Sequence, residues 1–271
     1  MPTLRSALPR PELRAYVRAY AQRFVLPTDP PLVEAVPAQL EQVLNFELGT
    51  MPGVQHRECP VSGRVWLGGA QTSFPGYMQL WPGVESFAIF FLPTGCSQLF
   101  GLPAREVTDR LHDAESVFGR WVTPLWDRLV EESCFERRVE VVEEFLLHRA
   151  LRASEPSRIA VAANFLFQEH GTVRIPKLLR REVVGLRQFE RLFQSEMGTS
   201  PKAFAKVARF QAALDAKLAR PGRSWLEIAH AFGYFDQMHM VHDFESLGLN
   251  TPSRLIQQMG DVRPPALVSS A

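Results

Sequence analysis

IAHAFGYFDQMHMVHDF, which runs from Ile228 to Phe244, has the pattern of two short helices joined by a tight turn. Gly233 can adopt the positive φ that ends the first helix, and the Asp236 side chain can cap the second helix by accepting a backbone N–H. Apolar residues recur at helical spacings on both sides of Gly233, at Ile228, Phe232, Met240 and Phe244. The sequence therefore predicts a helix-turn-helix unit.

The predicted second helix of this unit presents side chains on its outward face that could read DNA. They are Gln237, Met238, His239, Val241 and His242. A helix with such a face can enter a major groove and contact base edges. The same spacing also fits an ordinary two-helix hairpin of a globular domain, and this unit alone favours neither interpretation.

A weaker copy of the pattern precedes this unit, from Ile175 to Phe193. Its apolar positions are Leu178, Leu179, Val183, Leu186, Phe189 and Phe193, of which the last two match Met240 and Phe244. Each copy is followed by a proline, Pro201 or Pro252, eight residues after its last phenylalanine. One long helix is predicted between the copies, from Ala203 to Leu218. The repeat favours the DNA-binding interpretation over the hairpin.

Charge is unevenly distributed along the 271 residues, although the formal net charge is only +1. Residues 1–154 hold 15 Lys and Arg against 18 Asp and Glu, whereas residues 155–260 hold 14 against 10. This modest basic surplus supports DNA binding by the second half of the chain. No apolar run approaches the ~20 residues of a membrane span. Cys59, Cys96 and Cys134 show no paired spacing, so we expect a cytoplasmic protein with reduced cysteines and no membrane partner.

The first hundred residues favour strands. Short apolar runs such as QVLNFEL (42–48) and SFAIFFLP (86–93) alternate with Pro and Gly, which predicts a β-barrel or sandwich. Leu13, Val17 and Tyr20 have the spacing of one helix face near the start. The aromatic residues either form the core or line an effector pocket, and the candidate lining is Phe46, Trp66, Phe74, Trp81, Phe87 and Phe90.

Helical periodicity begins near Val107 and continues to Leu151. In ERRVEVVEEFLLHRAL the apolar stripe either packs on its own domain or forms a dimer contact. The polar segment 153–157 is a predicted linker. We therefore predict an α+β multidomain chain: a β-rich sensor or dimerisation domain with flanking helices over 1–152, an all-α domain over 153–260, and a flexible tail over 261–271.

The chain from Ile159 to Met259 resembles the DNA-binding domain of the AraC/XylS family of bacterial transcription regulators, most specifically in IAHAFGYFDQMHMVHDF followed by Thr251-Pro252. The first half resembles the cupin-like presumed sensor domain of one AraC-like subgroup, in VPAQLEQVLNFEL, WLGGAQT and FAIFFLPTGCSQLFGLPAREVTDRL. The resemblance implies two helix-turn-helix units on a rigid linker helix. It also implies double-stranded DNA and a small-molecule effector as partners, with RNA polymerase and a second copy of the chain as further candidates.

The resemblance assigns residues to DNA contacts. The second recognition helix would read bases through Gln237, Met238, His239, Val241 and His242, and the first through Arg187, Gln188, Glu190 and Arg191. Arg suits guanine and Glu suits cytosine, and Arg191 is the strongest candidate. Phosphates would be held by Thr199, Lys202, Arg209 and Thr251.

The first unit departs from the family pattern. Gly185 stands where a Ser usually caps the recognition helix, Leu179 replaces a small Ala, and Val183 replaces Gly. In the second unit His242 stands where Arg is frequent. These departures predict a distorted first unit and weaker or pH-sensitive base reading at His242.

The alternative function is a barrel enzyme with an appended DNA-binding domain. A cupin-like metal site needs several His converging from neighbouring strands, but this region offers only His56 and, just after it, His112. No phosphate loop or nucleophile elbow occurs, and Cys96 fits a buried apolar position. The sequence therefore predicts no catalytic residue, no metal and no cofactor. It predicts a sequence-specific, effector-controlled transcription regulator that is not an enzyme.

Overall fold

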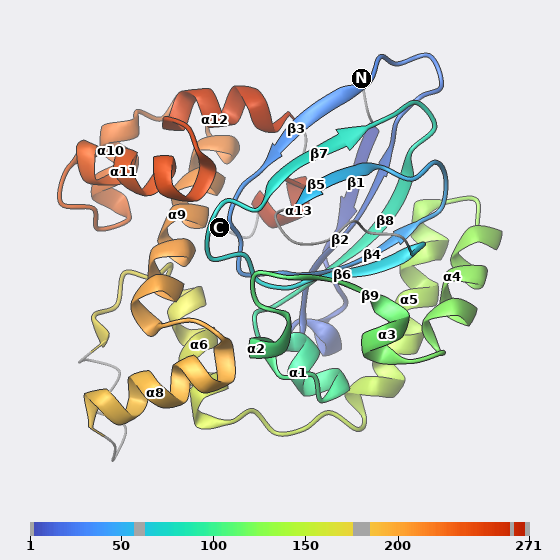
Figure 1. The fold of residues 1–271 in the computed structure, drawn as a ribbon, viewed down its shortest axis with the longest axis horizontal. Coiled ribbons are helices and arrows are strands. Elements are labelled where there is room, and N and C mark those ends of the chain that lie inside the picture. The colour runs from blue at the N-terminus through green and yellow to red at the C-terminus, as the bar shows by residue number, and fades with distance from the viewer. Residues whose placement is uncertain (1–2, 57–62, 176–184, 261–262, 269–271) are drawn as a thin grey trace.

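The computed structural model describes residues 3–56, 63–175, 185–260 and 263–268. A β-rich part with flanking helices precedes a helical part that lies beside it (Figure 1). This confirms the predicted α+β organisation. Among the described residues, no helix combines the length and the apolar character required to cross a membrane.

The β-rich part contains two antiparallel sheets. The larger has the order β1-β2-β8-β4-β6-β9, and the smaller has the order β3-β7-β5. The strands are β1 (Thr3–Ala7), β2 (Val17–Phe24), β3 (Leu32–Val36), β4 (Gln42–Glu47), β5 (Gly53–His56), β6 (Val65–Gly68), β7 (Gly76–Leu80), β8 (Glu85–Phe91) and β9 (Leu111–Asp113). The first part also holds a 3₁₀ helix, η1 (Pro11–Leu13), and the helices α1 (Gly95–Phe100), α2 (Ala104–Val107), α3 (Ala114–Phe118), α4 (Val122–Glu131) and α5 (Phe135–Ala150).

The period-two alternation of strands gives the large sheet two different faces. Leu44, Phe46, Phe87 and Ile89 are buried in one cluster with apolar residues of α1, α4 and α5. The intervening residues, such as Val43 and Ala88, face the other way, toward the small sheet. The amphipathic segment 135–150 thus packs on its own domain, as one of the two predicted interpretations requires.

The predicted helix near the start is wrong, because Val17 and Tyr20 belong to β2. A register irregularity between Val17 and Ala19 inserts an extra residue into the pairing with β8. Such a bulge lets residues three apart face the same side of a sheet. Val17 and Tyr20 therefore point together into the helix-covered core and imitate helical spacing.

The helical part confirms the predicted linker helix and the second helix-turn-helix unit, and of the first copy it describes the second helix, since residues 176–184 lie outside the described residues. It comprises α6 (Arg158–Gln168), α8 (Leu186–Met197), α9 (Pro201–Ala219), α10 (Trp225–Ala231), α11 (Gln237–Gly248) and α12 (Pro252–Met259). Pro201 and Pro252 each occupy the first turn of a helix, where proline costs no hydrogen bond. The matched residues of the two copies, Phe189 with Met240 and Phe193 with Phe244, are at most 1% exposed.

The C-terminal segment is not the predicted flexible tail at residues 263–268. Pro265–Val268 forms the short helix α13, and its Leu267 is fully buried. Ala266 and Leu267 pack against Val43 and Phe90 on the inner face of the large sheet. The chain therefore returns from the helical part to the β-rich part, and α13 lies beside the strands in Figure 1.

Candidate DNA interface and effector cavity

The second helix-turn-helix unit, α10–α11, has the predicted turn chemistry. Gly233 has φ 69°, and the Asp236 carboxylate accepts a hydrogen bond from His239 N at 2.7 Å. At the start of α10, Ser224 and Glu227 form a reciprocal capping box. Both helix starts and the turn are therefore fixed by local hydrogen bonds.

Four of the five predicted base-reading residues of α11 are exposed: Gln237, Met238, His239 and His242. Val241 is half-buried. The His242 ring lies 3.6 Å from the carboxylate of Glu245, one turn along the same helix. Phe235, which was not among the predicted contact residues, is 87% exposed in the turn just before α11. Its position between the turn residue Gly233 and the helix cap Asp236 is the sequence feature that indicates this exposure.

In the first unit, Arg187, Gln188, Glu190 and Arg191 all lie on the exposed side of α8, opposite Phe189 and Phe193. The predicted departures Leu179 and Val183 lie outside the described residues, as does Leu178. Gly185 is the N-cap of α8, with no side-chain cap bond. α8 therefore presents the predicted face but begins without a cap.

Replacing Gly185 with Ser is expected to stabilise the protein by a few tenths to about 1 kcal/mol, because a Ser hydroxyl would accept a free N–H of the first turn. The site suits Ser, since Gly185 has φ −71° and a Cβ there would meet no atom within 4 Å. Urea unfolding checks this. Ser224→Ala, which breaks the capping box of α10, is the opposite control, and destabilisation by Gly185→Ser would contradict the expectation.

The four predicted phosphate contacts differ in accessibility. Lys202 and Thr251 are exposed. Thr199 is only 7% exposed and lies two residues after Met197, whose backbone oxygen accepts from Thr108, the residue just after α2, at 2.8 Å. Arg209 lies 3.4 Å from the Asp243 carboxylate and 4.6 Å from the Tyr234 ring centroid. Contacts of Thr199 and Arg209 with phosphate would thus require these internal contacts to change.

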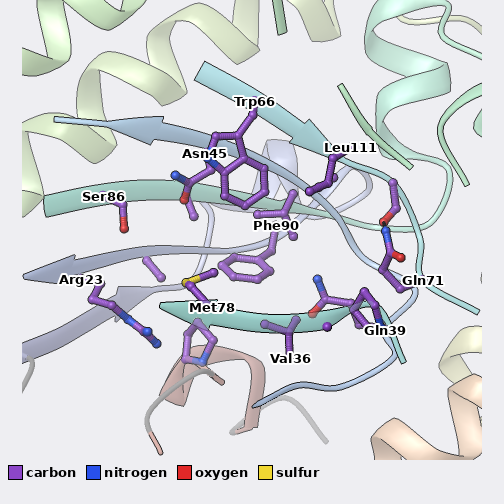
Figure 2. A pocket seen from close by; sticks show the side chains of 18 of the residues that line it. Arg23, Val36, Gln39, Asn45, Trp66, Gln71, Met78, Ser86, Phe90 and Leu111 are labelled. Atoms are coloured by element: carbon purple, nitrogen blue, oxygen red, sulfur yellow. Dashed lines mark hydrogen bonds between the residues drawn. The ribbon is translucent and has the colours of Figure 1, made fainter. Parts of the chain in front are cut away.

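A cavity of about 130 Å³ lies between the two sheets (Figure 2). Trp66, Phe90 and Met78 point into it, with Arg23 at one end and Gln71 at the other. Pro264, just before α13, also lines it. The remaining lining residues are Leu4, Ala21, Val36, Gln39, Val43, Asn45, Gly68, Gly69, Pro75, Gly76, Tyr77, Ser86, Ala88 and Leu111.

The structure corrects the predicted aromatic lining: of the six residues, Trp66 and Phe90 line the cavity and four do not. Phe46 and Phe87 lie on the opposite, helix-covered face of their strands. Phe74 is buried in the cluster that joins the two parts of the chain, and Trp81 is 40% exposed. Whether a strand residue faces the cavity or the helix-covered core depends on its place in the strand alternation and not on whether it is aromatic.

A buried carboxyl group, Glu47, lies behind the cavity wall. One of its oxygens accepts from Asn45 Nδ2 at 2.6 Å and from Trp66 Nε1 at 2.8 Å. The other oxygen is buried without a hydrogen-bond partner among the described residues. Burial raises the pKa of Glu47 from 4.5 to about 7, although the hydrogen bond from Trp66 opposes the shift.

Glu47→Gln is expected to stabilise the protein at pH 8 by about 1–3 kcal/mol and to have little effect at pH 4. The raised pKa means that the unfolded state loses the proton first, so wild-type stability falls as the pH rises from 4.5 to about 7. Gln keeps one acceptor for Asn45 and Trp66 and cannot ionise. Urea unfolding at pH 4 and pH 8 checks this, and destabilisation at pH 8 would contradict it.

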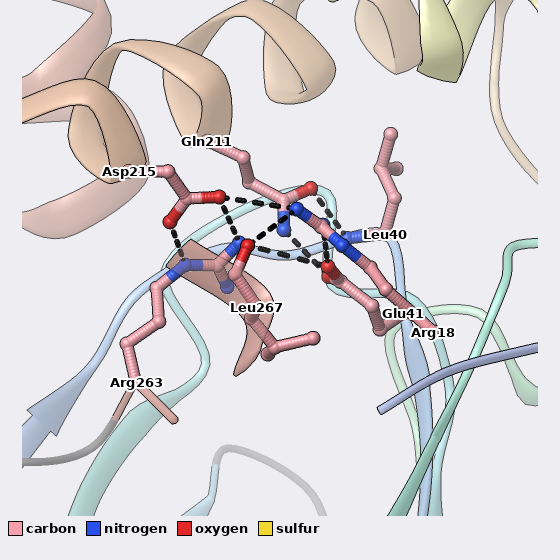
Figure 3. A network of polar contacts seen from close by, with 7 residues as sticks. All are labelled: Arg18, Leu40, Glu41, Gln211, Asp215, Arg263 and Leu267. Atoms are coloured by element: carbon pink, nitrogen blue, oxygen red, sulfur yellow. Dashed lines mark hydrogen bonds and ion pairs between the residues drawn. The ribbon is translucent and has the colours of Figure 1, made fainter. Parts of the chain in front are cut away.

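A buried ionic network joins the two parts of the chain (Figure 3). Arg263 forms ion pairs with Asp215 of α9 and with Glu41, which follows β3. Arg18 of β2 also pairs with both carboxylates. Gln211 of α9 donates to Glu41 at 2.5 Å. The side chains of Arg263, Glu41 and Asp215 are at most 3% exposed.

Comparison with known proteins identifies the helix-turn-helix region and a likeness of the overall fold. Residues 178–258 match the model of a helix-turn-helix domain, of the AraC type. No protein of curated function matches the chain. An apo variant of ToxT from Vibrio cholerae strain SCE256 has 9% sequence identity and a TM-score of 0.50, covering 89% of this chain and 97% of its own.

Two further ToxT structures show similar values. ToxT from Vibrio cholerae O395 has 9% identity and a TM-score of 0.48, covering 96% of this chain and 98% of its own. Wild-type ToxT from Vibrio cholerae strain SCE256 bound to an unsaturated fatty acid has 9% identity and a TM-score of 0.49, covering 96% of this chain and 95% of its own. At this identity the apo structure establishes a likeness of fold.

Proposed function

We propose that this chain, in which residues 178–258 form an AraC-type helix-turn-helix domain, is a sequence-specific double-stranded DNA-binding transcription regulator controlled by a small-molecule effector. One observation carries the proposal: α8 and α11 both expose polar faces and are both anchored by paired buried residues, Phe189 with Phe193 and Met240 with Phe244, around the linker helix α9. This arrangement suits two recognition helices on one rigid support.

The β-rich part is suited to control these helices because it contacts both units. Thr108, just after α2, donates to Met197 O at the end of α8, and Ala38 N donates to Leu247 O of α11 at 3.0 Å. In our proposal, an effector in the cavity between the sheets changes these contacts and so the placement of the recognition helices. The regulator acts in the cytoplasm without a catalytic role, and RNA polymerase and a second copy of the chain remain its candidate partners.

Binding of the full chain to the DNA upstream of its own gene tests the proposal. Fluorescence anisotropy should show tighter binding than to a shuffled sequence, with an affinity that falls at least about tenfold between 50 and 200 mM salt, because phosphate contacts release counterions. Equal affinity for the shuffled DNA would exclude sequence-specific recognition of this fragment. The absence of salt-sensitive binding to any promoter fragment would reject the regulator function.

A further inference from the structure

We infer that the cavity between the sheets selects an uncharged, mainly apolar ligand of about one ring, bearing a single hydrogen-bonding group. This inference names the ligand class and rests on the proposed function, in which the cavity receives the effector. It is carried by the size of the cavity, by the pairing of its charged lining residue and by the position of its polar groups.

Size and lining limit the ligand first. The cavity holds about 130 Å³, close to the ~150 Å³ of an engineered apolar cavity that binds benzene. Trp66 and Phe90 supply aromatic surface from the large sheet, and Met78 and Val36 face them from the small sheet (Figure 2). A flat apolar ring between two such walls would remove apolar surface of its two faces from water.

Charge limits the ligand next. Arg23 is the one charged residue among the described residues that line the cavity, and its side chain is 9% exposed. Its guanidinium donates to the Glu34 carboxylate at 2.6 Å, and the Glu34 side chain is 7% exposed. An anionic ligand would compete with Glu34 for Arg23, whereas a cationic ligand would meet a guanidinium at the cavity wall. An ionic ligand of either sign would therefore lose its hydration without gaining a complete ion pair in return.

Asn45 supplies the polar contact. Its amide Nδ2 donates one N–H to a Glu47 oxygen, and the indole N–H of Trp66 donates to the same oxygen. No described residue donates to Asn45 Oδ1 within the hydrogen bonds of the structure, and Asn45 lines the cavity. This oxygen can therefore accept from a ligand hydroxyl or amide N–H. A ring with one neutral donor matches the site.

Three matched single-ring probes test the inference on the full chain: benzyl alcohol, benzoate and benzylamine. Isothermal titration at pH 7.5 should show benzyl alcohol binding at least tenfold more tightly than either charged probe. Glu34→Gln removes the carboxylate charge that pairs with Arg23 at 2.6 Å and should strengthen benzoate binding at least tenfold, while benzyl alcohol changes less than threefold. Glu144→Gln is the matched control, since Glu144 forms an exposed pair with Arg128 and neither residue lines the cavity.

Arg23→Met should reverse the charge preference in the other direction, toward a cationic ligand. It leaves Glu34 as the unpaired charge, so benzylamine should gain at least tenfold, and either variant suffices if the other does not fold. Tighter wild-type binding of benzoate or benzylamine than of benzyl alcohol would overturn the inference. Failure of all three probes would also overturn it, and DNA binding measured on the same preparation would show separately whether the proposed regulator function stands.

Discussion

Arg263→Ala is expected to lower the free energy of unfolding by about 3–5 kcal/mol, because it leaves two buried carboxylates with one guanidinium partner in place of two. Asp215 and Glu41 are at most 1% exposed, and Arg263 contacts both. Arg18 also reaches both carboxylates but cannot neutralise two charges with one. Since Asp215 belongs to α9 and Glu41 to the β-rich part, the loss should fall on the junction between the two parts.

The same network predicts an acid dependence. Burial alone would raise the pKa of Glu41, but Arg18, Arg263 and the Gln211 hydrogen bond together hold it below its ordinary value of 4.5. A lowered folded pKa contributes stability that is present above pH 4.5 and is lost as the pH falls through the folded pKa. Arg263→Ala should therefore flatten the fall in stability of the wild-type protein below pH 4.5.

Urea unfolding of the full chain at pH 7 and at pH 3–5 checks both expectations. Arg128→Ala is the matched control, because the Arg128–Glu144 pair is more than half exposed and such pairs contribute about 0–1 kcal/mol. Arg263→Lys should recover part of the loss, since it keeps the charge without the planar fork. If Arg263→Ala were no more destabilising than Arg128→Ala, the network would not hold the two parts together.

Local structure could be predicted from the sequence where it depends only on residues that are neighbours along the chain. The turn at Gly233 and the cap at Asp236 follow from the conformational freedom of one residue and one side-chain acceptor. Pro201 and Pro252 begin helices for the same kind of local reason. The helix-turn-helix repeat could therefore be predicted from short stretches without knowledge of the partner surfaces.

Features that depend on distant contacts could not be predicted in this way. Whether Phe46 or Asn45 faces the cavity depends on which side of the large sheet the later helices cover. The burial of Leu267 and Arg263 depends on partners more than forty residues away in sequence, among them Asp215. The bulge after Val17 is visible only in the pairing with β8.

The combined variant Arg191→Ala and Gln237→Ala is expected to lose about 2–6 kcal/mol of specific DNA binding, the sum of ~1–3 kcal/mol per lost base contact. The two residues lie on different recognition helices, α8 and α11, and both are exposed. Each should read a different half-element, about ten base pairs apart if the helices enter successive major grooves on one side of the duplex. Distant contacts of this kind contribute nearly additively.

Selection of bound sequences from a random DNA pool separates the two contributions. Arg191→Ala should relax preference at one position of the first half-element, and Gln237→Ala at one position of the second, with shuffled-DNA affinity almost unchanged. Arg152→Ala and Gln257→Ala are the controls, because both residues are exposed and lie outside α8 and α11. An equal loss on all sequences would make the two residues phosphate contacts. An effect of Gln237→Ala alone would mean that the first unit, with its uncapped α8, does not read bases.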